Sequence, residues 1–139
     1  MIQQGRGTRR SDNNDSTNNL WDVWSAIPHP VLPEATAFVQ VQNSQHKIVV
    51  WSLQYCEFCW TLTRFLDRLG TPYERINIDN FKYAKDNMGN KYRAALQSQT
   101  DCKTFPLFFV GGKFIGGAVD ACMMWKKNEL QSLLAENGL

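Results

Sequence analysis

Apolar and polar residues alternate in distinct ways along the chain, and the clearest pattern surrounds two cysteines. Residues 47–53 are mostly β-branched and apolar, which predicts a buried strand. Behind the cysteines, four apolar residues recur at helical spacing: Leu62, Phe65, Leu66 and Leu69. Gly70 and Pro72 predict the end of this helix. Since apolar residues also recur at helical spacing after Glu34, we expect a helix, a strand and a second helix, with Cys56 at the strand-to-helix turn.

The second half of the chain continues with shorter patterns. Residues 73–78 alternate in character and predict a second strand. A helical pattern follows, with Gly89 as a candidate break, at Phe81, Ala84, Met88, Tyr92 and Ala95. Two further strands, 107–110 and 113–115, flank Gly111-Gly112, which is a two-residue hairpin signal. The last helix is predicted by the apolar residues Trp125, Leu130, Leu133 and Leu134.

The predicted order is helix, strand, helix, strand, helix, strand, strand, helix. A parallel β-α-β unit followed by an antiparallel hairpin and a closing helix is typical of α/β proteins with a thioredoxin-like fold, especially with a Cys-x-x-Cys motif at the first strand-to-helix turn. We therefore expect a four-stranded mixed sheet flanked by helices, with an extra N-terminal helix.

The first 33 residues differ in composition from the rest of the chain. Residues 1–19 are largely Gln, Gly, Asn, Ser and Arg, which predicts a flexible extension. Leu20, Trp21 and Trp24 could dock on the domain or bind a partner, and the early arginines leave a weak transit peptide open as an alternative. We expect a flexible extension over residues 1–33 and one domain over residues 34–139.

Composition and charge exclude several classes of function. The chain has 139 residues, of which 43% are hydrophobic and 20% charged, and its net charge is +2. No apolar run reaches the ~20 residues that a membrane-spanning helix needs. Neither nucleic acid nor a membrane surface is an expected partner. Because no apolar stretch follows Arg9-Arg10, we expect no secretion signal, a reducing cytoplasmic location and free cysteines, with organelle targeting by residues 1–33 as the alternative.

The Cys56-Glu57-Phe58-Cys59 motif carries the candidate chemistry. A helix N-terminus favours a thiolate, because unpaired backbone N–H groups and the helix dipole stabilise negative charge there. Cys56 is the predicted nucleophile, and Cys59, one turn further along, is the predicted resolving thiol. Half of a zinc site is an alternative, but Cys102 and Cys122 do not form a second close pair. A pair of inert buried cysteines is another alternative.

Several separate motifs agree in order and spacing with one family. They are Lys47-Ile-Val-Val-Trp-Ser52, Tyr55-Cys-Glu-Phe-Cys59, Lys103-Thr-Phe-Pro106 and Gly116-Gly-Ala-Val-Asp120. Together they resemble the dithiol glutaredoxins over roughly residues 34–139. The resemblance implies a monomeric glutathione-dependent thiol-disulfide oxidoreductase with a role in electron transport and cell redox homeostasis, which acts on glutathionylated or disulfide-containing proteins.

The resemblance also implies how glutathione is bound. The bond before Pro106 is expected to be cis, and the backbone of Phe105 to pair with the cysteinyl part of glutathione. Glycines at 116 and 117 let the backbone approach the ligand, while Lys103 matches a position that holds the glycine carboxylate. The expected glutathione-binding residues are Tyr55, Phe58, Gln97, Lys103, Thr104, Phe105, Pro106, Gly117, Val119 and Asp120.

Two residues depart from the family pattern. Leu53 replaces the usual lysine three residues before the nucleophile, and Glu57 replaces a frequent proline between the cysteines. Both changes make the surroundings of Cys56 less positive, so we expect a less activated thiol. Two other functions stay open: a dimer in which the nucleophilic cysteine and glutathione hold a [2Fe-2S] cluster, and a redox-sensing adaptor.

Overall fold

A mixed sheet forms the centre of the structure, a computed structural model that describes residues 30–139. Its strands are β2 (Ile48–Ser52), β3 (Glu74–Asn77), β4 (Leu107–Val110) and β5 (Lys113–Gly116), in the order β3-β2-β4-β5. β2 pairs in parallel with β3, whereas the β2-β4 and β4-β5 pairs are antiparallel. The Trp21 and Trp24 segment lies outside the described residues.

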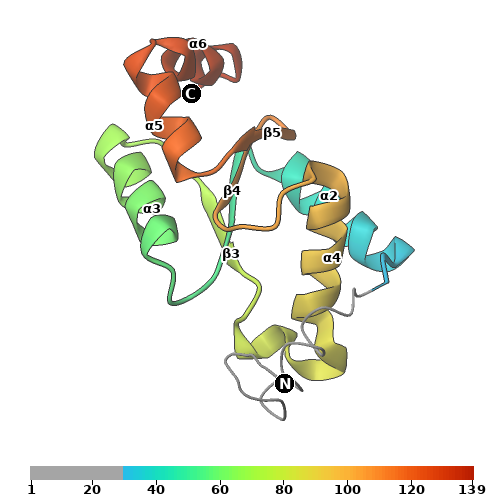
Figure 1. Cartoon of the computed structure of the whole chain (residues 1–139). Coiled ribbons are helices and arrows are strands. Elements are labelled where there is room, and N and C mark those ends of the chain that lie inside the picture. Colours follow the sequence, from blue (N-terminus) through green and yellow to red (C-terminus); the bar gives the residue numbers. More distant parts are fainter. Residues whose placement is uncertain (1–29) are drawn as a thin grey trace, which may run out of the picture. The chain divides into compact units, whose positions relative to one another are not determined.

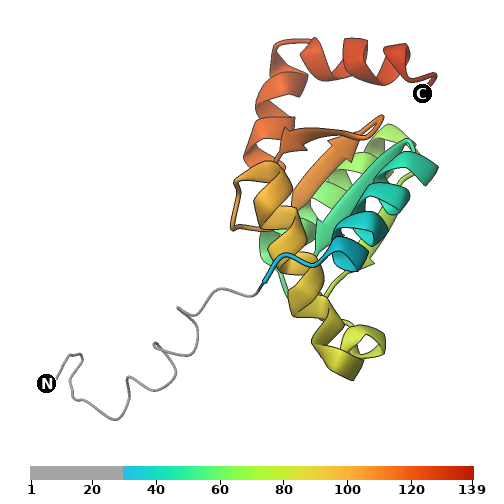
Figure 2. The same cartoon turned by 90° about the vertical axis from the view of Figure 1, so that its right-hand side faces the viewer.

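Helices cover both faces of this sheet (Figures 1 and 2). On one face, α2 (Pro33–Gln45) packs beside α4 (Met88–Thr100). On the other face lie α3 (Glu57–Leu69), α5 (Ala118–Lys126) and α6 (Glu129–Glu136). Successive residues of a strand point to opposite faces, so Val49 and Trp51 pack under the first pair of helices while Ile48 and Val50 pack under the second group. Every residue of β2 is consequently buried.

The arrangement confirms the predicted thioredoxin-like α/β architecture, with a four-stranded mixed sheet, flanking helices and a helix near the N-terminal end of the described range. The Gly111-Gly112 turn joins β4 to β5 as the sequence predicted. No helix within residues 30–139 has the length and apolar character needed to cross a membrane.

The predicted helix after β3 and the predicted last helix are both interrupted, at positions that their apolar spacing did not indicate. Residues 81–87 form two short 3-10 turns, and α4 begins only at Met88. The break lies at Asp86 and Asn87, both with φ of 57°, and not at Gly89. Gly89 instead lies in the first turn of α4 against the Ile78 carbonyl, where a Cβ atom would clash. The predicted last helix divides in the same way at Asn128, with φ of 61°, into α5 and α6.

Candidate functional site

Cys56 lies at the junction between β2 and α3. It is the N-cap residue of α3, and its Sγ accepts a hydrogen bond from the Cys59 backbone N–H at 3.3 Å. The loop before it is held from two sides. The indole Nε1 of Trp60 donates to the Gln54 carbonyl at 3.0 Å, and the Gln54 N–H donates to Asp79 at 2.9 Å. These contacts place a half-buried thiol at a helix N-terminus, where negative charge is stabilised.

Cys59 lies on the inner side of the same turn and is fully buried. Burial, together with a hydrogen bond with Cys56, raises the pKa of its thiol to about 12. A backbone hydrogen bond from Leu53 and the charge of Arg75 act in the opposite direction and lower this pKa. The two thiols of the motif therefore differ in access: an outside disulfide reaches Cys56 first.

A segment that is distant in the sequence, around Phe105 and Pro106, lies next to Cys56. The Phe105–Pro106 peptide bond is cis, as the family resemblance implied. The Cys56 thiol lies 3.9 Å from the Phe105 carbonyl oxygen, close enough for a weak S–H···O contact. Pro106 is buried, whereas Lys103 and Thr104 are exposed. The backbone of Phe105 thus borders the nucleophile from the side opposite α3.

A cavity of about 600 Å³ extends from this segment to the start of α5. The backbone N–H of Gly117 donates to the Asp120 carboxylate at 2.8 Å, which holds this carboxylate across the first turn of the helix. Gly116 has a φ of 138°, and a Cβ atom there would clash with the Asp120 side chain. The cavity is lined by Phe58, Cys102, Thr104, Phe105, Pro106, Phe114, Ile115, Gly116, Gly117, Ala118, Val119 and Asp120.

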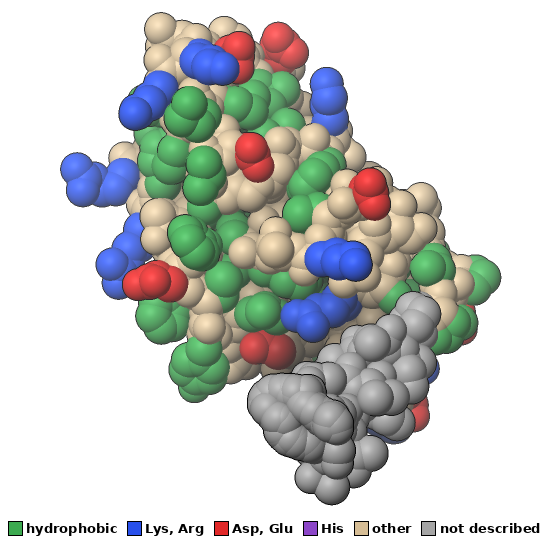
Figure 3. Space-filling view, in the orientation of Figure 1, with side chains coloured by type: hydrophobic (Ala, Val, Ile, Leu, Met, Phe, Trp, Pro, Cys, Tyr) green, Lys and Arg blue, Asp and Glu red, His purple; other side chains and the backbone are tan. Residues whose placement is uncertain are grey.

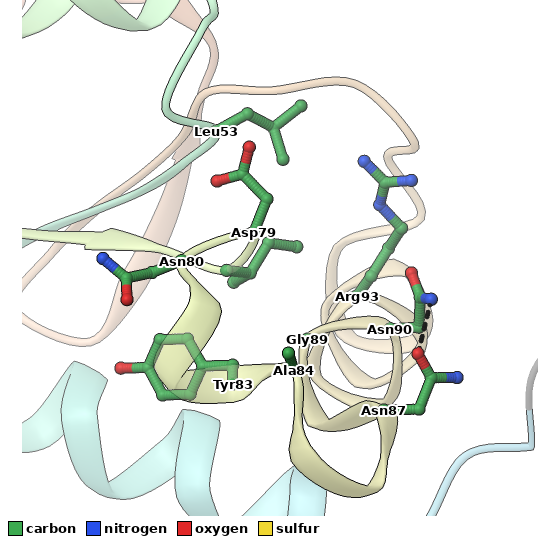
Figure 4. Close-up of a pocket in the computed structure, with 10 residues that line it drawn as sticks. Leu53, Asp79, Asn80, Tyr83, Ala84, Asn87, Gly89, Asn90 and Arg93 are labelled. Atoms are coloured by element: carbon green, nitrogen blue, oxygen red, sulfur yellow. Dashed lines mark hydrogen bonds between the residues drawn. The ribbon is translucent and has the colours of Figure 1, made fainter.

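A second, smaller cavity of about 250 Å³ lies between Leu53, the 3-10 turns and α4 (Figure 4). Asn87 and Asn90 are hydrogen-bonded to each other at its edge, at 2.8 Å. Arg93 extends from the same helix, across from Asp79 and Asn80 (Figure 4), and its guanidinium carbon lies 5.1 Å from the centroid of the Phe105 ring. Its Nε is buried and has no hydrogen-bond partner among the described residues. Arg93 therefore places a cation beside Phe105. Leu53, which lines the same small cavity, supplies no charge there.

The structure brings most of the predicted site residues together. Seven of them line the larger cavity: Phe58, Thr104, Phe105, Pro106, Gly117, Val119 and Asp120. Tyr55, directly before Cys56, is 87% exposed. Gln97 lies on α4 but lines neither cavity described above, and its carbonyl accepts a hydrogen bond from the Asp101 N–H. Its role in binding stays a prediction.

The sequence reasoning missed two arginines. Arg93 is four residues before Gln97, so both lie on one face of α4, and their spacing alone could not decide which one faces the site. Arg75 alternates with Tyr73 and Asn77 along β3, a signal that was visible as a charged residue inside a strand pattern. Contacts from other elements distinguish them from ordinary surface cations.

The surface around the site mixes charge and apolar groups. On the face shown in Figure 3, hydrophobic side chains gather between scattered basic and acidic ones. Phe58 is 59% exposed and Val119 65% exposed. Within residues 30–139, no three His, Cys, Asp or Glu side chains are grouped in a way that could hold a metal ion. All four cysteines are free thiols.

Comparisons with known proteins agree on one family. The family model for glutaredoxin matches residues 48–115. A glutaredoxin of Ricinus communis is 33% identical over 95 residues, which are 68% of this chain and 88% of that protein. The mitochondrial glutaredoxin-2 of Mus musculus is 27% identical over 128 residues, or 92% of this chain and 74% of that protein.

Solved structures of similar proteins lead to the same family. A mutated buckwheat glutaredoxin superimposes with a TM-score of 0.69 and 30% identity, covering 76% of this chain and 91% of that one. A buckwheat glutaredoxin-glutathione complex has a TM-score of 0.67 and 29% identity, with coverages of 77% and 96%. Each of these two matches therefore covers about three quarters of this chain.

Proposed function

Because this chain belongs to the glutaredoxin family, whose members are thiol oxidoreductases, we propose that it reduces protein disulfides and glutathione mixed disulfides with Cys56 as nucleophile and Cys59 as resolving thiol. The observation that carries the proposal is the placement of Cys56. Its thiol is at the start of α3 and lies next to the Phe105 carbonyl, which belongs to the cis peptide bond before Pro106. A substrate disulfide can enter from this side, whereas Cys59 is buried.

The proposed reaction on a glutathione mixed disulfide has two steps. The Cys56 thiolate attacks the glutathione sulfur, the substrate S–S bond breaks, and the substrate leaves as a thiolate that takes a proton from water. A second glutathione thiolate then attacks the glutathione sulfur bound to Cys56. Oxidised glutathione leaves, and the Cys56 thiolate is restored. Each turnover consumes one free glutathione, because the other half of the oxidised glutathione comes from the mixed disulfide itself.

A protein disulfide requires the second cysteine. Cys56 first forms a mixed disulfide with one substrate sulfur and releases the other as a thiolate. The Cys59 thiolate then attacks the Cys56 sulfur, which expels the second substrate thiol and leaves a Cys56–Cys59 disulfide. Two glutathione molecules reduce that disulfide. The burial of Cys59 supports this order. Cys59 is shielded from an outside substrate, but it lies one helical turn from Cys56 and can attack the Cys56 sulfur.

We place glutathione in the larger cavity. Its cysteinyl part pairs with the backbone of Phe105, as in β-strand addition, which leaves its sulfur facing Cys56. Its γ-glutamyl carboxylate accepts from the N–H groups at the start of α5, at Val119 and Asp120, where the helix dipole favours negative charge. The Asp120 carboxylate, already fixed by Gly117, binds its amino group.

The glycine carboxylate of glutathione needs a cation, and position 53 does not supply one. Lys103 is exposed next to Thr104, and Arg93 lies against the ring of Phe105 from the other side. We assign both to this carboxylate. The unpartnered Nε of Arg93 supports the assignment, since a buried guanidinium N–H is stabilised by an acceptor.

The expected protein partners, the monomeric state and the cytoplasmic location are proposals of the same kind. Two relatives carry the words mitochondrial and chloroplastic in their names, which supports organelle targeting by residues 1–33 as the alternative location. The boundary between the extension and the domain at residue 33, and the alternative functions as cluster-binding dimer or adaptor, stay predictions.

The test is the glutathione-dependent turnover of a mixed disulfide by the wild type and by three Cys→Ser variants. Cys56→Ser should abolish turnover, while Cys59→Ser should keep most of it on a glutathionylated substrate and lose reduction of a protein disulfide. Cys122→Ser is the matched control, because Cys122 is exposed on α5, and it should behave as wild type. Turnover that survives in Cys56→Ser would refute the proposal, and an equal loss in both motif variants would indicate a strictly dithiol donor.

A further inference from the structure

A polar cluster lies beneath the start of α3, on the sheet face that carries the apolar core of this helix. Ser52 is fully buried at the end of β2, and the next strand places Asn77 opposite it. The Ser52 hydroxyl donates to the Asn77 side-chain oxygen. Arg75 reaches into this cluster from β3. Its Nε donates to Ser52 Oγ at 2.9 Å and to Asn77 Oδ1 at 3.0 Å.

The other end of the Arg75 guanidinium binds the loop that leads to the cysteines. Its Nη2 donates to the Leu53 carbonyl at 3.2 Å. Leu53 also provides the backbone hydrogen bond that lowers the pKa of the Cys59 thiol. Arg75 therefore fixes the same peptide segment that contacts the resolving cysteine. All three acceptors are neutral oxygens, so none of these bonds neutralises the positive charge of Arg75.

The charge of Arg75 acts on Cys59 as well. Burial raises the pKa of the Cys59 thiol, and Arg75 lowers it. In the free protein Cys56 also raises this pKa, through its charge and through a hydrogen bond. Once Cys56 is in a mixed disulfide, its negative charge is gone. The hydrogen bond from the Leu53 backbone and the charge of Arg75 then lower the pKa of the Cys59 thiol, while burial still raises it.

The charged and titratable groups around Cys59 come from two elements. Cys56 lies on its own helix start, and Arg75 lies on β3. Further along the same face, Tyr73 donates to Asp67 at 2.9 Å, and Arg75 lowers the pKa of that phenol too. Arg75 is thus a cation on the sheet whose charge acts on the resolving thiol.

We propose that Arg75 is a positioning residue for the second thiol-disulfide step, in which Cys59 closes onto Cys56. This inference rests on the proposed function, in which Cys56 carries the mixed disulfide. In this step the Cys59 thiolate attacks the Cys56 sulfur, the bond between Cys56 and the glutathione or substrate sulfur breaks, and the departing thiolate takes a proton from water. Arg75 stabilises the attacking thiolate and holds the Leu53 peptide in register with it.

The experiment separates the two steps by rapid mixing. The reduced full-length chain is mixed with a fluorescent glutathione mixed disulfide, so that transfer to Cys56 and the later release of glutathione give two phases. Arg75→Met removes the charge at nearly constant length. If the thiolate fraction of Cys59 falls about threefold and its intrinsic nucleophilicity rises about 1.7-fold, the release phase should slow about twofold near pH 7. Its pH profile should move upward by about half a unit, and the transfer phase should keep its rate.

Two further variants identify the cause. Arg75→Lys keeps the charge but not the forked hydrogen bonds, so its pH profile should stay near that of the wild type. Arg64→Met is the control, because it removes an equal charge from the exposed surface of α3. If Arg75→Met does not fold, Arg75→Gln replaces it, since its amide still donates to Ser52.

The outcomes distinguish this inference from the proposed function. An unchanged release phase and pH profile in a folded Arg75→Met or Arg75→Gln protein would overturn the role of Arg75. Equal slowing of both phases would overturn it as well, because Arg75 would then support the whole site. Absence of the transfer phase in the wild type would instead refute Cys56 as nucleophile.

Discussion

Arg93 is a residue to which the sequence patterns did not point, and its replacement by Met gives the sharpest test of the glutathione site. The guanidinium lies against the Phe105 ring at 5.1 Å from its centroid, and its Nε is buried without a partner. A hydrogen bond between charged groups contributes about 1.5–3 kcal/mol. Because Arg93 is half-buried, solvent screening reduces this to about 1–2 kcal/mol, which corresponds to a rise of about 5- to 30-fold in the KM for glutathione.

The assay is steady-state turnover of a mixed disulfide at varied glutathione concentration. Arg93→Met should raise KM and leave kcat within about threefold, since Arg93 binds the ligand away from the reacting sulfurs. Lys85→Met is the matched control. It removes an exposed cation next to Ala84, which lines the smaller cavity together with Arg93. Gln97→Ala tests the α4 residue that the family resemblance implied for glutathione binding.

Each alternative gives a distinct result. A KM that is unchanged in Arg93→Met but raised in Gln97→Ala would refute the assignment from the structure and restore that from the sequence. Similar increases in Arg93→Met and Lys85→Met would show a general effect of positive charge, without a specific site. A loss of kcat alone would mean that Arg93 acts on the reacting groups.

Two further predictions concern stability. Gly89→Ala should lower the free energy of unfolding by about 1–3 kcal/mol in urea denaturation, because its Cβ meets the Ile78 carbonyl; an unchanged or raised midpoint would contradict the close approach of α4 to β3. The folded state holds the Cys59 proton up to a pKa of about 12, whereas the unfolded thiol loses it near 8.5, so stability should fall as pH rises between these values. Under reducing conditions Cys59→Ala should show a shallower decline from pH 8 to pH 10, and equal slopes would refute the protonated buried thiol.

Local patterns were sufficient for much of the architecture. A strand has a period of two and a helix one of 3.6, so the run before Cys56 and the apolar stripe behind it specified a strand, a turn and α3. The Gly111-Gly112 turn determined the hairpin through residues adjacent in the chain. The position of Cys56 at a helix start follows from these short-range features alone.

Interruptions inside helices were not visible in the same patterns. Asp86, Asn87 and Asn128 adopt left-handed backbone angles, which are uncommon for non-glycine residues but are tolerated best by Asn and Asp. The apolar spacing runs on through these positions, because each piece on either side packs on the same core. Hence the sequence offered Gly89 as the break where the structure has it at Asp86 and Asn87, and it predicted one last helix where α5 and α6 are separate.

Within the site, the sequence by itself identified the residue types, and the tertiary structure decided which of them meet. The two cysteines are three residues apart, so their relation is a property of one helical turn. The contact between Cys56 and the Phe105 carbonyl joins residues 49 apart, and the bond from Arg75 to Leu53 joins residues 22 apart. Such contacts depend on how sheet and helices pack, since hydrophobic periodicity records only whether a residue faces the core. For this reason the nucleophile could be named from the chain alone, whereas the roles proposed for Arg75 and Arg93 rest on contacts that only the fold creates.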